Sequence, residues 1–242
     1  MNKLIVANWK MNPKTEKEAI SLAKAEDKRG VVIAPPFVFL SSLRDVLKKA
    51  SLGAQDVFWE NPRQGGVYTG EMSARMLKKS GVKYVIIGHS QRRSLGETDK
   101  MINKKVKTAL ETGLKVILCV GENLNIRCKG KKAVENFIQK QLKDDLAGIR
   151  NWKLVIRNLF IAYEPVWAIS TNKGARADTK EDAAEMIKFI KKFLVLSLKL
   201  KVKVLYGGSV NSKNAKGFLE ISDGLLVGGA SLKSVEFLKI LR

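Results

Sequence analysis

The feature that most constrains this chain is a short apolar run that recurs eight times along its length. Each run holds three to five residues, too few for a helix, and many of these residues are β-branched. The runs are continuously apolar rather than alternating, which favours parallel strands buried on both faces of a sheet. They are Leu4–Ala7, Val31–Ala34, Leu52–Ala54, Tyr84–Ile87, Val116–Val120, Leu159–Ala162, Val202–Tyr206 and Gly224–Val227.

Helical patterns fill most of the gaps between these runs. Thr179 precedes apolar residues at helical spacing, and Asp182 three residues on completes the pattern of a capping box. Thr15 and Glu18 give the same signal for an earlier helix. The order along the chain is therefore strand, helix, strand, helix.

Eight such units in 242 residues predict an α/β fold, a closed (β/α)₈ barrel with parallel strands. That barrel typically takes ~250 residues, whereas an open doubly wound sheet uses five or six strands. Gly81 and Gly113 stand where helices should end before the fourth and fifth runs. Since no Pro-rich or Ser-rich linker divides the chain, we expect a single domain over residues 1–242.

Composition excludes several classes of protein. Apolar residues make up 45% of the chain and charged residues 28%, which rules out intrinsic disorder. No apolar run approaches the ~18 residues of a membrane span, and the four at Leu4–Ala7 are too few for a signal peptide, so we expect a cytoplasmic protein. Cys119 and Cys128 lack the spacing of a metal site, so we expect reduced thiols and no metal.

Polar residues follow several runs at the edge where barrel enzymes carry their chemistry. Asn8 and Lys10 follow the first run and should point to the same side if the backbone stays extended. His89 follows the fourth run and Glu164 the sixth. Each alone is weak evidence, but a cation, an imidazole and a carboxylate at one rim predict an active site.

Gly-Gly pairs follow the seventh and eighth runs, at 207–208 and 228–229. Glycines before a helix leave backbone N–H groups free at its N-terminus, and barrels often hold phosphate after these two strands. The pattern predicts a phosphorylated substrate.

Seven ordered motifs resemble those of the triosephosphate isomerase family, and they span almost the whole chain. They are Asn8-Trp9-Lys10-Met11-Asn12, Ala34-Pro35-Pro36-Phe37, Tyr68-Thr69-Gly70-Glu71, Gly88-His89-Ser90-Gln91-Arg92-Arg93, the segment from Ala162 to Ile169, Tyr206-Gly207-Gly208-Ser209-Val210 and Val227-Gly228-Gly229-Ala230-Ser231.

The resemblance implies that dihydroxyacetone phosphate and D-glyceraldehyde 3-phosphate interconvert through an enediolate, without a cofactor, in glycolysis and gluconeogenesis. It makes Glu164 the base and His89 a neutral electrophile, with Lys10 stabilising the oxyanion and Asn8 positioning substrate. It also implies that substrate is bound by Asn8, Lys10, Ser170, Ser209, Gly228 and Gly229.

Two departures from the family pattern stand out. In residues 165–177, the expected lid, Ser170 and Asn172 replace glycines, so we expect a working lid with altered closing kinetics. Gln91 replaces a glutamate expected near Lys10, which removes a negative charge. One interpretation is a tolerated change of modest cost, and the other is an impaired or repurposed enzyme.

Partners are suggested by one loop and by the charge. Asp56–Ser73 is an 18-residue irregular stretch, and the resemblance implies a homodimer formed through it, with Glu71 and Arg92 as a candidate ion pair. The formal net charge of +22 admits a nucleic-acid-binding module as an alternative. The lysines are scattered over helices without interleaved aromatic residues, which argues against nucleic acid and favours solvated faces or steering of an anionic substrate. Another phosphate-handling barrel enzyme is the third interpretation.

Overall fold

A computed structural model describes residues 3–62, 65–149, 152–169 and 177–242. Eight parallel strands form a closed barrel in sequence order, and β8 pairs with β1 through Leu4 and Gly224. The predicted (β/α)₈ fold is thereby confirmed. The strands are β1 (Leu4–Asn8), β2 (Val31–Ala34), β3 (Ser51–Ala54), β4 (Tyr84–Ile87), β5 (Lys115–Val120), β6 (Leu159–Tyr163), β7 (Lys203–Tyr206) and β8 (Gly224–Val227).

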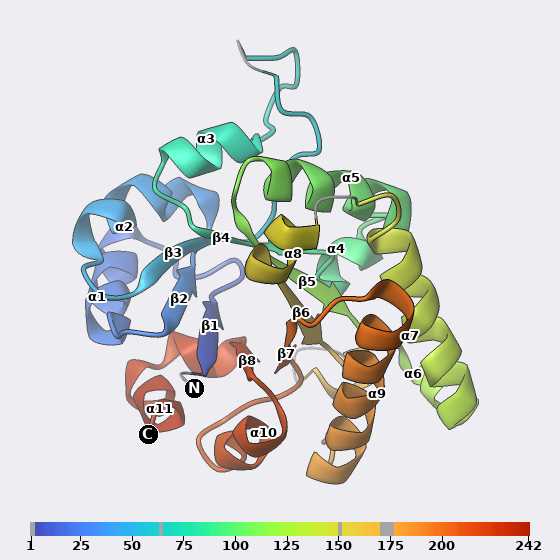
Figure 1. Ribbon diagram of the computed structural model, residues 1–242. Helices are drawn as coiled ribbons and strands as arrows, with labels where there is room; N and C mark the ends of the chain where they lie inside the picture. The colour runs from blue at the N-terminus through green and yellow to red at the C-terminus, as the bar shows by residue number, and fades with distance from the viewer. Residues whose placement is uncertain (1–2, 63–64, 150–151, 170–176) are drawn as a thin grey trace.

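Helices surround this barrel (Figure 1). Three short 3₁₀ turns follow the C-terminal ends of strands, η1 (Phe37–Phe39), η2 (Val166–Ala168) and η3 (Gly229–Leu232). The α-helices are α1 (Glu16–Glu26), α2 (Leu40–Val46), α3 (Ala74–Lys79), α4 (Ser90–Ser94), α5 (Asp99–Glu111), α6 (Leu124–Arg127), α7 (Lys131–Asp145), α8 (Trp152–Asn158), α9 (Lys180–Leu198), α10 (Ala215–Ile221) and α11 (Ser234–Ile240). Within the described ranges, no helix combines the length and the apolar character that a membrane span requires.

All eight predicted runs are strands, and their limits shift by at most one residue. Lys115 and Lys203 begin β5 and β7, because their backbones pair with Tyr84 and Phe160 whatever their side chains are. Val202, expected in the seventh strand, lies just outside it. Backbone pairing rather than side-chain polarity therefore sets where these two strands begin.

The barrel interior is filled with side chains. Alternate strand residues pack there into one buried cluster, while the other set faces the helices in a second, larger core. Chemistry is thus confined to the two ends of the barrel. The inner cluster is Leu4, Val6, Val32, Ala34, Tyr84, Ile86, Ile117, Cys119, Phe160, Ala162, Leu205 and Leu226.

Helix ends follow the predicted signals closely. Thr15 and Glu18 form a reciprocal capping box at the start of α1. Thr179 accepts a hydrogen bond from the Asp182 N–H and so caps α9 from one side. Gly81 and Gly113 follow α3 and α5 with φ of 86° and 80°, a conformation that favours glycine.

The long irregular loop predicted at 56–73 projects from the barrel beside α3 (Figure 1). Its base is held by a parallel bridge between Phe58 and Ser73. Near its tip, Val67 is 97% exposed and Tyr68 42% exposed, although the Tyr68 ring contacts Phe58 with centroids 4.8 Å apart. Two large apolar side chains are therefore accessible near the tip of the loop.

Candidate active site

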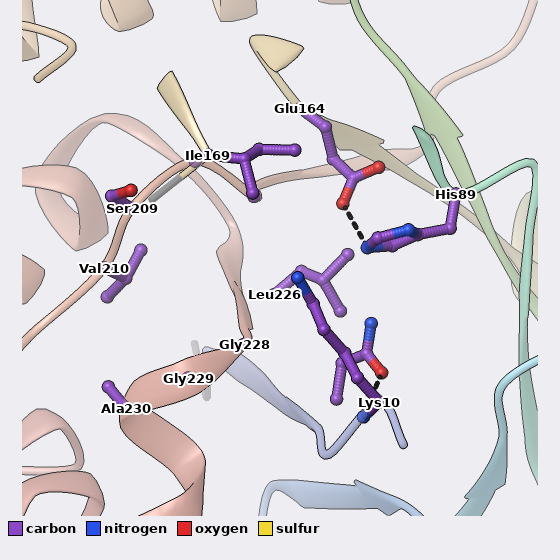
Figure 2. A pocket seen from close by; sticks show the side chains of 13 residues that line it. Lys10, His89, Glu164, Ile169, Ser209, Val210, Leu226, Gly228, Gly229 and Ala230 are labelled. Atoms are coloured by element: carbon purple, nitrogen blue, oxygen red, sulfur yellow. Dashed lines mark hydrogen bonds and ion pairs between the residues drawn. The ribbon is translucent and has the colours of Figure 1, made fainter. Parts of the chain in front are cut away.

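The predicted catalytic residues meet in one cavity at the C-terminal ends of the strands. Asn8 ends β1 with Lys10 two residues beyond it, His89 follows β4, and Glu164 follows β6. Figure 2 shows Glu164 and His89 facing each other, with the Lys10 side chain directed toward them. Ser209, Gly228 and Gly229 line the same cavity.

The centre of the site is a short contact between two buried side chains. His89 Nε2 lies 3.1 Å from Glu164 Oε1, and the two residues are 6% and 2% exposed. His89 Nδ1 accepts a hydrogen bond from the Gln91 N–H at 3.2 Å, as the N-cap of α4. Nδ1 is therefore unprotonated, and the proton of a neutral imidazole lies on Nε2.

Glu164 is held as a carboxylate in spite of its burial. Burial by itself raises the pKa of Glu164, but the hydrogen bond from His89, the Ser90 N–H at 3.3 Å and the nearby Lys10 charge lower that pKa below its ordinary value. Burial lowers the pKa of Lys10, and the negative charge of Glu164 offsets part of this decrease. The cavity thus holds an ionised carboxylate beside an imidazole N–H group.

Lys10 reaches the cavity by a backbone conformation that the sequence pattern did not predict. Its φ is 54°, in the left-handed region, so the alternation of an extended strand does not apply to it. The Asn8 Oδ1 accepts from the Lys10 N–H at 3.1 Å, and Gln55 Nε2 donates to the Lys10 carbonyl at 2.7 Å. These bonds hold a costly conformation in place.

Gln55 was missed by the sequence reasoning, although it directly follows the third strand and so meets the same strand-end criterion. Glu26 was missed as well. Its Oε2 accepts from the Trp9 indole N–H at 3.1 Å, and both side chains are fully buried. Trp9, between Asn8 and Lys10, is thereby fixed to the end of α1.

Glycine is required at the β7 end because there is no room for a side chain. A Cβ at Gly207 would lie 2.8 Å from Glu164 Cγ, and one at Gly208 would lie 2.2 Å from the Tyr206 hydroxyl. Ser209 Oγ donates to the Ala168 carbonyl at 2.6 Å. The β7 turn therefore packs tightly against Glu164 on one side and η2 on the other.

Comparisons with known proteins find matches over almost the whole chain. The family model described as triosephosphate isomerase matches residues 3–242. The chain belongs to the triosephosphate isomerase family. Proteins named triosephosphate isomerase are 45% identical in Thermoanaerobacter pseudethanolicus, with 98% of each chain covered, and 44% identical in Dictyoglomus thermophilum, with 99% of this chain and 98% of the relative covered. The relative from Caldanaerobacter subterraneus is 46% identical, with 98% of each chain covered.

Membership in the triosephosphate isomerase family makes the chain an intramolecular aldose–ketose isomerase. Its reaction interconverts dihydroxyacetone phosphate and D-glyceraldehyde 3-phosphate, the step that the family contributes to glycolysis and gluconeogenesis. The chemistry required is the movement of a proton between adjacent carbons.

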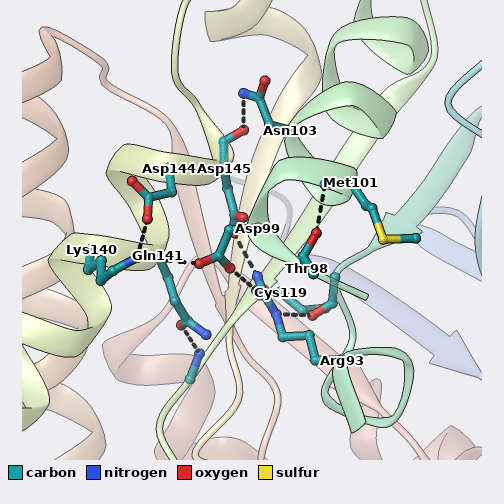
Figure 3. A network of polar contacts seen from close by, with 12 residues as sticks. Arg93, Thr98, Asp99, Met101, Asn103, Cys119, Lys140, Gln141, Asp144 and Asp145 are labelled. Carbon is teal, nitrogen blue, oxygen red and sulfur yellow. Dashed lines mark hydrogen bonds and ion pairs between the residues drawn. The ribbon is translucent and has the colours of Figure 1, made fainter. Parts of the chain in front are cut away.

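Arg93 lies in a network of polar contacts (Figure 3) and holds the backbone next to His89 in this triosephosphate isomerase family site. Its guanidinium donates to the Gly88 carbonyl at 2.8 Å and to the Cys119 carbonyl at 3.1 Å. The same group pairs with Asp99 and Asp145, each at 2.6 Å. His89 follows Gly88 directly, so Arg93 fixes the point from which the imidazole projects.

Glu122 anchors the start of the predicted lid segment. Its carboxylate accepts from the Trp167 indole N–H at 2.7 Å and from the Tyr163 hydroxyl at 3.2 Å. Burial raises the pKa of Glu122, and these donors oppose the rise. The remainder of the lid, including Ser170 and Asn172, lies outside the described residues.

Two residues of α4 take part in predicted contacts. Arg92 pairs with Asp56 at 2.8 Å and with Glu97 within the chain, and the charge of Glu71 also raises the pKa of Arg92. The Glu71–Arg92 ion pair expected beside a subunit interface stays a prediction. The Gln91 side chain is exposed, and within the described ranges only its backbone takes part in hydrogen bonds, so a contact with Lys10 also stays a prediction.

Proposed function

We propose that Glu164, His89, Lys10 and Asn8 carry out the isomerisation. The observation that supports this most strongly is the 3.1 Å contact between the neutral His89 Nε2–H and the ionised Glu164. One group accepts protons and the other donates them, at the same end of the barrel.

Glu164 takes the proton from C1 of dihydroxyacetone phosphate, and the electron pair of that C–H bond forms the enediolate. His89 Nε2 gives a proton to the C2 oxygen, and the resulting imidazolate recovers one from the C1 oxygen. Glu164 then returns its proton to C2, which yields glyceraldehyde 3-phosphate. Protons balance over the cycle, so no cofactor is needed.

Substrate must first separate the two groups. In the present arrangement the Nε2–H that polarises the carbonyl is directed at Glu164, and the Ser90 N–H holds the other carboxylate oxygen at 3.3 Å. A carbonyl oxygen that takes the His89 proton releases Glu164 toward the carbon. Lys10 then stabilises the oxyanion, and Asn8 positions substrate beside it.

The phosphate would be bound by Ser170, Ser209, Gly228 and Gly229 together with Lys10. Gly228 supports this role because a Cβ there would lie 3.4 Å from Lys10 Cε, and at Gly229 no atom lies within 4 Å of a Cβ position. An oxygen-rich ligand can therefore approach the backbone of η3 next to a cation.

The experiment that tests these roles measures isomerisation of glyceraldehyde 3-phosphate in a dehydrogenase-coupled assay, with methylglyoxal monitored alongside. Glu164→Gln should lower kcat by about 10³-fold or more, because the base is lost while the fold is kept. Lys10→Ala should lower kcat/KM by about 10²-fold or more, whereas Lys3→Ala, at the other end of β1, should leave it unchanged. Equal losses for Lys10→Ala and Lys3→Ala, or full activity of Glu164→Gln, would refute the assignment.

We further propose a cytoplasmic homodimer formed through Asp56–Ser73. The projecting loop, with Val67 97% exposed, supports a partner surface at its tip. Sedimentation equilibrium at micromolar concentration should give twice the mass of one chain, and a fully active monomer would contradict the proposal.

A further inference from the structure

The N-terminal end of the barrel carries a second cavity, with a volume of about 750 Å³. Leu4, Tyr84, Lys115, Phe160 and Lys203, from the first or second positions of five strands, border it. The strands are parallel and the proposed catalytic residues follow their other ends, so the filled barrel interior separates the two cavities. The reaction makes no use of this cavity.

The inner wall of this cavity is apolar. Tyr84 and Phe160 belong to the barrel interior, and their ring centroids lie 5.8 Å apart. At the rim, Ile156 on α8 and Val195 on α9 are each 44% exposed. These side chains leave an accessible apolar surface between the barrel and two helices.

Basic side chains surround this apolar surface. Among the described residues, Asp223 is the one acidic residue that lines the cavity, and it already pairs with Lys191 at 2.7 Å and accepts from the Val204 N–H at 2.9 Å. We call the cavity and its basic residues the basic mouth. Those residues are Lys3, Lys115, Arg157, Lys191, Lys201 and Lys203.

The other cations of the basic mouth are not neutralised by acids. Lys115 Nζ lies 5.0 Å from the Tyr84 ring centroid, an interaction with an aromatic face. Arg157, Lys201 and Lys203 are exposed, and in the described part of the chain no carboxylate lies within ion-pair distance of them. Like charges gathered at one opening repel each other, so a bound anion relieves that repulsion.

We propose that the basic mouth binds an organic polyphosphate of the nucleoside di- or triphosphate class. Several phosphates match several cations, and a base or sugar can cover the apolar surface at Ile156 and Val195. Triose phosphates and inorganic phosphate lack a base or sugar that could cover this apolar surface. The volume is within the ~300–1,000 Å³ of small-molecule sites, and a concave site of this size can hold one small ligand.

The test is a calorimetric titration of the purified protein with ATP at low salt, with excess glycerol 3-phosphate occupying the triose phosphate site. The double variant Lys115→Ala, Lys203→Ala should raise the Kd for ATP about tenfold or more. The matched control Lys100→Ala, Lys104→Ala removes two exposed charges from α5 and should leave the Kd unchanged. Isomerase activity and thermal melting of each variant check that the fold is intact.

A second pair of measurements separates nucleotide recognition from charge attraction. Ile156→Ser, Val195→Ser should weaken ATP binding about tenfold but leave tripolyphosphate binding unchanged. The proposal fails if wild type does not bind ATP, or if the control pair on α5 loses as much affinity. It also fails if tripolyphosphate binds wild type as tightly as ATP, or if single-stranded RNA of about 20 nucleotides binds more tightly through the same lysines.

Discussion

Glu26 is the residue whose position is hardest to reconcile with its chemistry. It is fully buried at the end of α1, and its Oε1 is without a hydrogen-bond partner among the described residues. Burial raises the pKa of Glu26 to about 8, against the opposing effect of the Trp9 hydrogen bond. At neutral pH the side chain is therefore mainly protonated, a neutral acid that holds Trp9 beside Lys10.

The raised pKa of this one residue makes the stability of the folded protein depend on pH. Unfolded Glu26 loses its proton near pH 4.5 and folded Glu26 near pH 8, so between these values the folded state binds more protons and its stability falls as pH rises. Glu26→Gln removes this dependence. Relative to wild type, the variant should gain roughly 1–3 kcal/mol in free energy of unfolding between pH 5 and pH 8.

Urea denaturation of wild type and Glu26→Gln at pH 5 and pH 8 measures the difference in free energy of unfolding between the two proteins. The contributions of other titrating groups cancel in this difference, because both proteins contain them. Glu111→Gln, at an exposed position of α5, is the matched control and should show no such gain. A difference between wild type and Glu26→Gln that is identical at pH 5 and pH 8 would contradict the assignment.

Residues of this kind mark what could not be predicted. His89 and Glu164 could be predicted from the sequence because each lies within two residues of the end of a strand, and the structure brings them within 3.1 Å. Glu26 belongs to a polar helix, in which a carboxylate is normally expected to be exposed to solvent. The left-handed backbone of Lys10 could not be predicted from its neighbours in sequence, since lysine rarely adopts a φ of 54°. Both depend on tertiary contacts that single-sequence patterns do not contain.

At the scale of elements, four segments meet at one guanidinium. Arg93 on α4 joins the end of β4, the end of β5, the start of α5 and the end of α7. Asp145 is fully buried, and burial raises its pKa to about 7 even though Arg93 opposes the rise. The helices and strands here could be predicted from the sequence, but the ion pair that joins them could not, because Arg93 and Asp145 are 52 residues apart in sequence.

Arg93→Met should lower the free energy of unfolding by roughly 3–5 kcal/mol, because it leaves Asp145 buried without its cation. Arg93→Lys should lower the free energy of unfolding by a smaller amount, since a positive charge remains beside Asp145. In a double-mutant cycle measured by urea denaturation, Asp145→Asn should recover part of the loss caused by Arg93→Met. Fully additive effects of the two substitutions would show that the pair is not coupled.

At the scale of the whole molecule, a formal net charge of +22 makes the surface attractive to anions. If this field steers substrate, kcat/KM for glyceraldehyde 3-phosphate should fall about tenfold as NaCl rises from about 10 to 150 mM, which shortens the screening length from ~30 to ~8 Å. The value of kcat should stay constant, because screening acts on encounter rather than on chemistry. A flat kcat/KM in steady-state assays would mean that the lysines serve only as solvated surface.

Closure of the barrel by β1 and β8 also governs the order in which the protein can be completed during synthesis. Leu4 pairs with Gly224, 220 residues later. At ribosomal rates of roughly 5–20 residues per second, β1 leaves the exit tunnel and waits roughly 10–45 s for its last neighbour. Throughout that interval one edge of β1 is open to wrong pairing, so we expect this nascent chain to depend on chaperones until its final strand has emerged.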